Sequence, residues 1–203
     1  AYHSMKQNDW FDPFFVLENL SEEDKLIKKN VMDFSNKVLR PIVIKDNRNH
    51  CFDKNIYKEF GNLGLLGSTI KGYGGGEASN TAYGLIAYEI EKIDSSYRSS
   101  ISVQSSLVIH PIDTYGSNKQ KEKYLPDLIS GDKIGCFGLT ESEAGSDPSS
   151  MKTTYKKDQD GYILNGSKNW ITNAPIADVF IIWALNESHE TNSIKGFILE
   201  KNA

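Results

Sequence analysis

Residues 136–147 read CFGLTESEAGSD. Small and hydroxyl side chains surround three carboxylates here: Gly138, Thr140, Ser142, Gly145 and Ser146 around Glu141, Glu143 and Asp147. Glycine lets a backbone come close to a ligand, and successive backbone N–H groups of a loop can bind an anion. The stretch therefore suits the binding of a phosphate or of the polar edge of a planar cofactor. An ordinary turn is the alternative, because Gly/Ser/Asp stretches commonly form turns after an apolar run.

A second motif lies further along the chain, where residues 165–174 read NGSKNWITNA. Together the two motifs, F-G-L-T-E-x-x-x-G-S-D and N-G-S-K-N-W-I-T-N-A, resemble the flavin-binding signature of the acyl-CoA dehydrogenases. The pair is specific, because chance would not place both motifs in this order at this spacing. The resemblance extends from about residue 20 to residue 203, which is nearly the whole chain.

The composition is typical of a globular chain of one or two domains, with 203 residues and a net charge of −4. The mild acidity argues against nucleic acid as a partner. No apolar run is long enough to cross a bilayer, so no membrane span is expected, and no targeting segment is recognisable. Two cysteines and four scattered histidines lack metal-ligand spacing, so neither a metal site nor a disulfide is expected.

The part of the chain before residue 131 has the hydrophobic period of amphipathic helices. An irregular arm is expected over residues 1–19. Two prolines, Pro41 and Pro126, are expected to end or bend the helices in which they lie. Five helices are predicted, which begin at or near Ser21, Asp53, Asn80, Arg98 and Ser117.

A glycine run at residues 72–76, GYGGG, raises the alternative of a dinucleotide site. The run lacks the G-x-G-x-x-G spacing, because Glu77 stands where the third glycine should be, and no strong strand precedes it. A loop between helices is the better interpretation.

The period changes from helical to two after Gly131, which indicates strands. Two turn signals, Asp160-Gly161 and Asn165-Gly166, predict hairpins. A continuous apolar run over residues 179–184 predicts a strand that is buried on both faces. The other strand candidates are residues 134–139, 151–155, 162–164, 168–172 and 197–199. Helices followed by strands indicate an α+β fold or two domains, with a boundary near residues 131–134.

The resemblance implies a more specific fold. Residues 20–133 correspond to an all-α N-terminal domain, and residues 134–203 correspond to an incomplete middle domain, a truncated antiparallel β-barrel. A C-terminal helical bundle follows in the family but has no counterpart here, so we expect an N-terminal fragment or a short relative. The family's catalytic base, a glutamate, lies in that bundle. No catalytic residue is therefore assigned in this chain, and the chain alone is expected to be inactive.

The resemblance also implies the flavin contacts. Thr172 would place its hydroxyl near the flavin N5, and Ser146 would face the pyrophosphate or the acyl-CoA. Without the resemblance, Trp170 is explained equally well as an aromatic side chain in a barrel core. The residues that the resemblance assigns to FAD are Phe137, Gly138, Leu139, Thr140, Glu141, Gly145, Ser146, Trp170, Ile171 and Thr172.

A third stretch, SYRSSISVQSS at residues 96–106, resembles the glutaryl-CoA dehydrogenase branch of the family. In that branch an arginine at the Arg98 position, with Ser99 and Glu91, lies at the far end of the acyl pocket. A dicarboxylic acyl group ends in a carboxylate, and arginine can pair with it through two hydrogen bonds. Glu91, Arg98, Ser99 and Ser146 are therefore the expected substrate contacts. The alternative is that Arg98 is merely a surface charge near a helix start, where the helix dipole does not favour it.

These observations predict an FAD-dependent acyl-CoA dehydrogenase, with oxidative decarboxylation of glutaryl-CoA to crotonyl-CoA as the leading function. The resemblance implies an electron-transferring flavoprotein as electron acceptor, a homo-oligomer, and the mitochondrial matrix as the location. Another short-chain acyl-CoA is the alternative substrate, and a non-enzymatic folding or binding module is the alternative class. One departure from the family is Ser142, which stands where a proline is usual.

Overall fold

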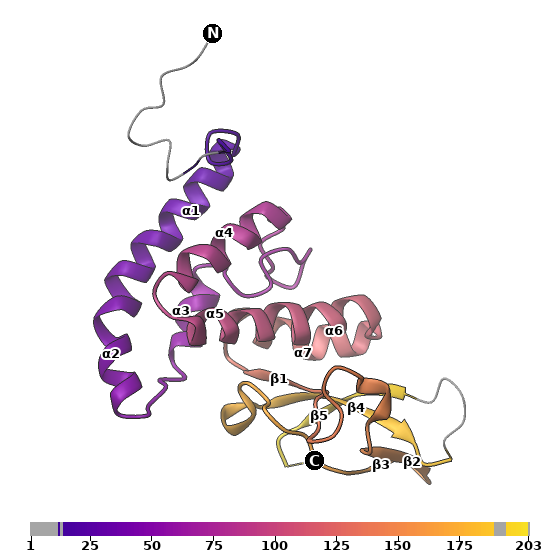
Figure 1. Cartoon of the computed structure of the whole chain (residues 1–203). Helices are drawn as coiled ribbons and strands as arrows, with labels where there is room; N and C mark the ends of the chain where they lie inside the picture. The colour runs from indigo at the N-terminus through magenta and orange to yellow at the C-terminus, as the bar shows by residue number, and fades with distance from the viewer. Residues whose placement is uncertain (1–11, 13, 189–193, 203) are drawn as a thin grey trace.

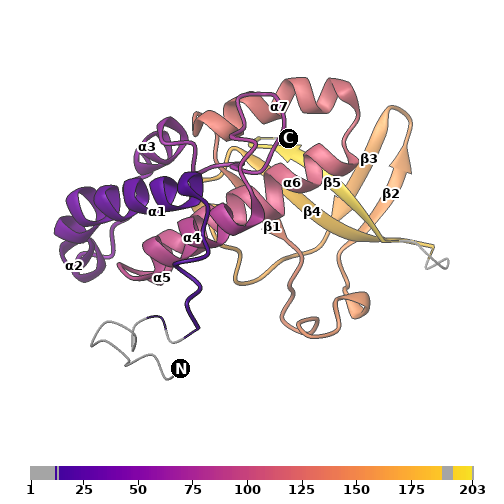
Figure 2. The same cartoon turned by 90° about the horizontal axis from the view of Figure 1, so that it is seen from above.

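The computed structural model describes residues 12, 14–188 and 194–202. Helices fill the part of the chain before residue 131, and they stand on one side of a five-stranded sheet formed by the rest (Figures 1 and 2). The predicted arm over residues 1–19 lies largely outside the described residues, and its described part consists of turns and bends. The predicted order of helices and then strands is confirmed.

The first helix, α1 (Glu22–Phe34), begins as predicted, because the Ser21 hydroxyl accepts a hydrogen bond of 3.0 Å from the Asp24 N–H. Pro41 was predicted to end the helix or to start a bend, and the first of these alternatives is wrong. A π-helical segment, η2 (Ser35–Leu39), joins α1 directly to α2 (Arg40–Arg48), and Pro41 lies in the first turn of α2. The wider π turn shifts the backbone hydrogen bonds by one residue, so the missing N–H of the proline falls where it disturbs the helix least.

The next two helices, α3 (Ile56–Asn62) and α4 (Asn80–Glu91), flank the glycine run, which is a loop as predicted. The helix α4 begins where it was predicted, with the Ser79 hydroxyl as its cap. The cap position of α3 is Asn55 rather than Asp53, although an Asp53 carboxylate oxygen accepts a hydrogen bond of 2.9 Å from the Asn55 N–H.

The helix predicted from Arg98 begins three residues earlier, at Ser95, because the Asp94 carboxylate caps it. It runs as α5 (Ser95–Ser102), a second π-helical segment η3 (Val103–Ile109) and α6 (His110–Tyr115). Mid-helix π segments occur frequently at functional sites.

The last helix, α7 (Asn118–Ser130), begins with the predicted capping role of Ser117, whose hydroxyl accepts from the Gln120 N–H. Pro126 was predicted to bend or end this helix, and it does not end it, because the helix continues for four residues beyond it and packs two of them, Leu128 and Ile129, into the core. Gly131 ends the helix instead in the left-handed conformation, with φ of 77°.

The sheet is mixed, so the antiparallel part of the fold prediction is wrong. Its strands are β1 (Gly135–Gly138), β2 (Thr154–Asp158), β3 (Gly161–Asn165), β4 (Val179–Asn186) and β5 (Ile194–Glu200). The strand β4 pairs antiparallel with β5 but parallel with both β1 and β2. Long connections separate β1 and β2 from β4, which permits parallel pairing. No pairing among the described strands closes them into a barrel.

Two turn predictions had different outcomes. The hairpin of β2 and β3 exists, with Asp158 paired to Gly161, so its turn lies at residues 159–160, one residue before the predicted pair. The strand predicted over residues 168–172 is wrong. That segment leaves the sheet after Asn165, and the Asn169 N–H donates a 2.9 Å hydrogen bond to the Thr140 carbonyl of another loop.

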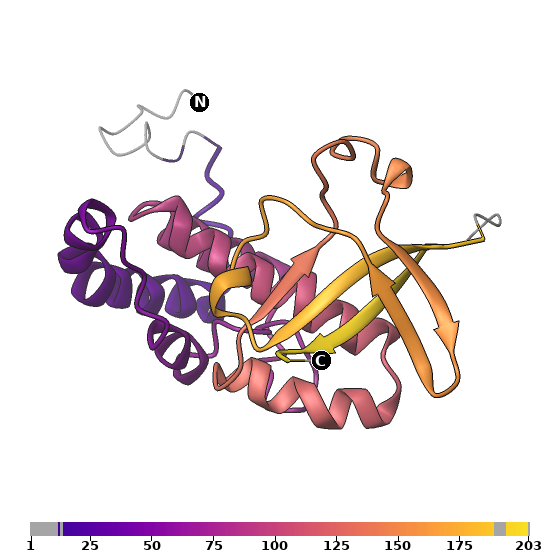
Figure 3. The same cartoon turned by 90° about the horizontal axis from the view of Figure 1, so that it is seen from below.

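The strands β1 and β2 share one edge of β4. The pairing of β1 ends at Ile182, and the pairing of β2 begins at Leu185. The chain between them, residues 139–153, leaves the sheet at this gap and forms the loop seen beside β4 in Figure 3. Residues 139–147 of the first predicted ligand-binding motif therefore lie outside the sheet, whereas residues 136–138 belong to β1.

One fully buried side chain, Gln104, joins the helices to the sheet. Its amide nitrogen donates to the carbonyls of Leu128 and Lys133, both at 2.9 Å, and its amide oxygen accepts a 2.8 Å hydrogen bond from the Gly135 N–H. A Cβ at Gly135 would lie 2.4 Å from the Val108 side chain, so glycine is needed for this close contact.

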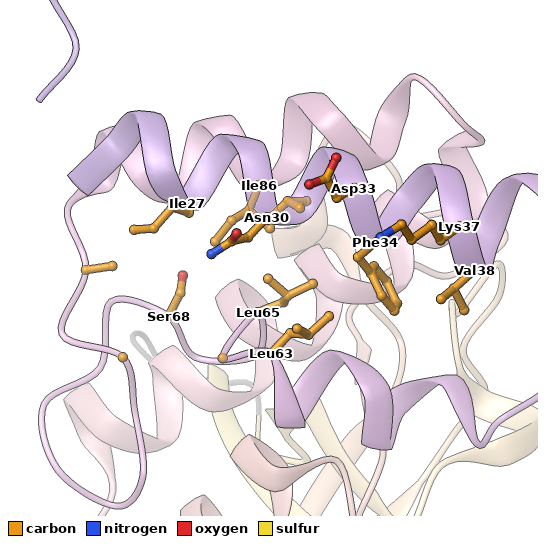
Figure 4. A pocket seen from close by; sticks show the side chains of 14 residues that line it. Ile27, Asn30, Asp33, Phe34, Lys37, Val38, Leu63, Leu65, Ser68 and Ile86 are labelled. Carbon is orange, nitrogen blue, oxygen red and sulfur yellow. The ribbon is translucent and has the colours of Figure 1, made fainter. Parts of the chain in front are cut away.

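A cavity of about 510 Å³ lies between α1, η2 and the loop that follows α3 (Figure 4). Its walls are mainly apolar, with Ile27, Phe34 and Leu65 among them. Ser68 also lines it, and the buried hydroxyl of this serine has no hydrogen-bond partner among the described residues.

Candidate functional site

The loop over residues 139–144 is folded back on itself. The Glu141 N–H donates to the Ala144 carbonyl at 3.1 Å, and the Ala144 N–H donates to the Glu141 carbonyl at 3.2 Å. Ser142 and Glu143 lie exposed at its tip, while Glu141 and Ala144 are buried. The substitution of serine for the family's usual proline therefore affects the tip and not the buried anchors.

The buried Glu141 carboxylate anchors this loop. It accepts hydrogen bonds from the backbone N–H groups of Lys152 at 2.6 Å and Thr153 at 3.0 Å, and from the Lys168 ammonium at 2.7 Å. Burial alone would raise the pKa of this carboxyl, but the bonds from Lys168, Thr153 and Lys152 outweigh it and lower the pKa to about 2. Glu141 is therefore ionised at neutral pH.

The second motif packs directly against this loop. The Lys168 ammonium also donates to the Leu139 carbonyl at 3.0 Å, and the neighbouring Asn169 N–H donates to the Thr140 carbonyl at 2.9 Å. The two segments that the sequence assigned to one cofactor, 137–146 and 168–172, are thus held side by side.

Trp170 lies at the outer side of this pair of segments. Its side chain is 94% exposed, and its φ of 58° is the left-handed conformation that is uncommon for residues other than glycine. The alternative that Trp170 fills a barrel core is therefore wrong. Ile171 is half-buried and Thr172 is exposed beside it.

Several donors of the two segments have no partner. In the described part of the chain, the N–H groups of residues 170–172 and the hydroxyls of Thr140, Ser146 and Thr172 make no hydrogen bond. A flavin ring presents a flat apolar face and a rim of acceptors, and donors around the rim stabilise the negative charge that builds on reduction. A large exposed indole beside free donors therefore fits an isoalloxazine ring.

The remaining predicted flavin residues are either partly or fully buried at the end of β1 or lie in the exposed part of the loop. The Phe137 ring is half-buried and packs edge-on against Trp183, with 6.0 Å between the ring centroids. Gly138 is buried, and a Cβ there would lie 2.6 Å from Ile182. Gly145 and Ser146 are exposed.

The predicted substrate residues divide into two places. Glu91, at the end of α4, and Arg98, in the first turns of α5, are joined by a hydrogen bond of 2.6 Å between Nε and Oε2. Hydrogen bonds from Ser95 and then from Arg98 lower the pKa of the Glu91 carboxyl. Ser99 is half-buried next to Arg98, whereas Ser146 has no contact with this pair among the described residues.

The Arg98 guanidinium keeps its end free. Glu91 engages only Nε, and in the part of the chain that the structure describes neither terminal nitrogen makes a hydrogen bond. These two nitrogens form the fork that pairs with a carboxylate. The shallow hollow beside the guanidinium is lined by Ala87, Tyr88, Glu91 and Lys92.

Sequence reasoning missed two residues that hold the site together. Lys168 lies inside the second motif, and its position among small residues was a usable signal. Gln104 lies inside the stretch 96–106, but nothing in its sequence neighbourhood indicates that it bonds three distant backbone groups.

The structure describes no cluster of three or more histidine, cysteine or acidic side chains that could hold a metal ion, within residues 12, 14–188 and 194–202. In the same residues, none of the helices has the length and apolar character needed to cross a membrane.

Comparisons with known proteins agree with the motifs. The family profile described as the acyl-CoA dehydrogenase N-terminal domain matches residues 21–132, and that of the acyl-CoA dehydrogenase middle domain matches residues 136–203. An acyl-CoA dehydrogenase of Bacillus subtilis (strain 168) is 37% identical over 186 residues, which are 91% of this chain and 49% of the relative. The mitochondrial isovaleryl-CoA dehydrogenase of Pongo abelii is 38% identical over 192 residues, which are 92% of this chain and 45% of the relative.

A crystal structure of a glutaryl-CoA dehydrogenase from Mycobacterium smegmatis in complex with FADH2 superimposes with a TM-score of 0.89 at 40% identity, over 95% of this chain and 48% of that one. The chain spans about half the length of the curated relatives it matches. FAD, the cofactor predicted from the motifs, is confirmed by family neighbours crystallised with FADH2 or, in an acyl-CoA dehydrogenase from Bacillus anthracis, with FAD. The family consists of oxidoreductases. With both family profiles matched over most of its length, the chain belongs to the acyl-CoA dehydrogenase family.

Proposed function

We propose that this chain supplies the flavin-side and acyl-side walls of an FAD-dependent dehydrogenase that acts on glutaryl-CoA. In this proposal residues 20–133 form a helical domain and residues 134–203 form part of a β-domain, a portion of the family's barrel. The observation that carries the proposal is the close packing of the 139–141 loop against residues 168–172, with unpaired donors and an exposed indole beside it.

The donors of both segments would hold the ring system of FAD. The Thr140 hydroxyl and the N–H groups of residues 170–172 could donate hydrogen bonds to the acceptor atoms at the edge of the ring. The Trp170 indole could pack against the face of the ring. Ser146, on the exposed part of the loop, is available to the pyrophosphate or to the acyl-CoA. When bound, FAD supplies the two-electron acceptor for the dehydrogenation.

Arg98 would select the acyl group. A dicarboxylic acyl chain must bury its distal carboxylate, which is unfavourable unless a positive partner is present. Glu91 holds the Arg98 side chain at Nε and leaves the two terminal nitrogens for that carboxylate. In glutaryl-CoA this contact would fix the end of the chain where the carboxylate is later lost as carbon dioxide.

Another short-chain acyl-CoA is the second candidate substrate. The supporting observation is the Glu91 contact itself, because it already neutralises Arg98 and so reduces the need for a substrate carboxylate. The relatives named above differ in the acyl groups that their names state, so family membership leaves both substrates open.

The proposal extends to the partners of the full-length protein. They are an electron-transferring flavoprotein as the electron acceptor and further copies of the chain in a homo-oligomer, in the mitochondrial matrix. The support for each of these is the family resemblance.

The flavin role is tested by titrating the full-length protein with FAD while recording tryptophan fluorescence. Trp170 is exposed and would be covered by the ring, so we expect quenching on binding that is lost in Trp170→Phe. Trp183 packs against Phe137, so Trp183→Phe is the matched control and should keep the quenching. Equal quenching in Trp170→Phe and the wild type would contradict the proposed position of the flavin.

A further inference from the structure

We infer that the Glu141–Lys168 ion pair is a positioning device that holds the two flavin segments in register, and that Glu141 acts without touching the flavin. The inference rests on the proposed function and refines it, since the family signature places Glu141 among the flavin contacts. Glu141 Oε1 lies 2.7 Å from Lys168 Nζ, and both side chains are only 8% exposed.

Both oxygens of the carboxylate have hydrogen-bond donors within the protein. One oxygen, Oε1, accepts from the Lys168 ammonium and the Thr153 N–H, and the other, Oε2, accepts from the Lys152 N–H. Two of these donors lie at the far end of the same loop, and the third belongs to the second motif. A buried carboxylate with these partners affects ligand binding indirectly, because it fixes the position of the backbone beside the ligand.

The Lys168 ammonium has an acceptor within the protein for each of its N–H groups. It has three N–H groups, and it has three partners: Glu141 Oε1, the Leu139 carbonyl at 3.0 Å and the Met151 sulfur at 3.9 Å. Every partner lies between residues 139 and 151, so the lysine holds both ends of the exposed loop. Because Asn169 follows directly and donates to the Thr140 carbonyl, the pair sets the distance between Thr140 and Trp170.

The same loop carries a contrasting ion pair. Glu143 pairs with the Lys152 ammonium, but their side chains are 68% and 73% exposed. An exposed pair contributes little, whereas removal of one partner from a buried pair leaves an unpaired charge. The Glu143–Lys152 pair is therefore a matched control for the Glu141–Lys168 pair, in the same loop and with the same chemistry.

The test is a double-mutant cycle on the FAD dissociation constant of the full-length protein. We expect Glu141→Gln and Lys168→Met each to weaken FAD binding at least tenfold. The double variant should bind better than the product of the two single effects predicts, because it buries no unpaired charge. Glu143→Gln and Lys152→Met should each change the constant less than twofold, without coupling.

Two further measurements separate positioning from folding. The absorption spectrum of bound flavin reports its surroundings, and we expect it to change in Lys168→Met and not in Lys152→Met. Thermal unfolding of the flavin-free protein reports the fold alone. An unchanged dissociation constant and spectrum in the presence of lowered thermal stability would overturn the inference, as would single effects that multiply without coupling.

Failure of the proposed function gives a different result. If the wild-type full-length protein binds no FAD, the proposed function is wrong. The rate of hydrogen exchange at the Asn169 amide then tests whether the ion pair holds the two segments together. Faster exchange in Lys168→Met than in Lys152→Met would support its role in holding the segments together, and equal exchange would overturn it.

Discussion

Arg98 Nε donates to Glu91 Oε2 over 2.6 Å, across the turn that joins α4 to α5. The contact spans seven residues, so it depends on the turn and not on a regular helical spacing. It fixes the direction of the guanidinium while leaving its outer edge free. A residue that reads as an isolated charge in the sequence is thus one half of an oriented pair.

Arg98→Gln is expected to lower kcat/KM for glutaryl-CoA and to leave butyryl-CoA nearly unchanged in the full-length enzyme. An unpaired buried carboxylate is unfavourable by about 3–5 kcal/mol, which corresponds to about 100- to 1000-fold or more in kcat/KM. Arg98→Lys should recover only part, because an ammonium does not make the planar two-point contact. Steady-state kinetics with both substrates measure this.

The control for this prediction is Arg40→Gln, which removes a surface arginine whose Nε donates to Asn36, four residues earlier in η2. Both substrates should keep their rates in this variant. If kcat/KM falls by the same factor for glutaryl-CoA and butyryl-CoA in Arg98→Gln, then Arg98 has a structural role and the glutaryl proposal loses its physical support.

In Glu141→Gln, the free energy of unfolding is expected to depend less on pH in the acid range than in the wild type. The folded pKa of about 2 lies below the ordinary value of 4.5, so the ionised carboxylate stabilises the fold above about pH 4.5, and this contribution is lost as the pH falls towards 2. The difference corresponds to about 3 kcal/mol at neutral pH. Urea unfolding between pH 2.5 and 7 measures it. In the Glu143→Gln control the slope should change much less, because the Lys152 partner lowers the pKa of Glu143 as well but both side chains are exposed. An unchanged slope in Glu141→Gln would contradict the prediction.

Gln104→Leu is expected to destabilise the protein by roughly 2–4 kcal/mol, because the carbonyls of Leu128 and Lys133 and the N–H of Gly135 would lose their buried partner. Chemical denaturation measures the loss. Gln159→Leu, at the exposed β2–β3 turn, is the control and should change stability by less than about 0.5 kcal/mol. Equal effects at both positions would show that the junction does not depend on Gln104.

Two neighbouring serines are expected to respond in opposite ways to alanine. Ser68 buries a hydroxyl without a partner among the described residues, so Ser68→Ala should be neutral or stabilising by up to about 1 kcal/mol. Ser105 accepts a 3.1 Å hydrogen bond from the Gly67 N–H, so Ser105→Ala should destabilise by about 1–2 kcal/mol. Thermal unfolding compares them. Marked destabilisation in Ser68→Ala would indicate that its hydroxyl has an essential partner.

Local chemistry made much of the fold predictable. Ser21 and Ser117 cap helices as predicted, because each cap depends on a side chain and a backbone N–H only three residues apart. The glycine loop and the change from helices to strands were predictable for the same reason.

The errors arose where distant segments decide the structure. Pro41 does not end its helix because a π turn absorbs it. Residues 168–172 do not form a strand because their partners lie in the 139–141 loop. The direction of β1 relative to β4 depends on the path of the chain between them, which hydrophobic period does not encode.

The motifs predicted which segments belong to one site, but not how they are joined. The sequence assigned Glu141 and Trp170 the same kind of role, since both lie in the family signature. In the structure one is buried among protein donors and the other is almost wholly exposed. Burial results from the packing of the whole chain, so a motif alone does not distinguish a ligand contact from the residue that supports it.

The shared edge of β4 has a consequence for the order of events during synthesis. The ribosome releases β1, the 139–153 loop and β2 before β4, yet both strands pair with β4. Contacts between segments far apart in sequence form late. Nascent chains stalled before Val179 has emerged should therefore be cut by protease within residues 139–153, and chains released past Asn186 should resist. The loop that would hold the cofactor is thus among the last parts of this chain to acquire its shape.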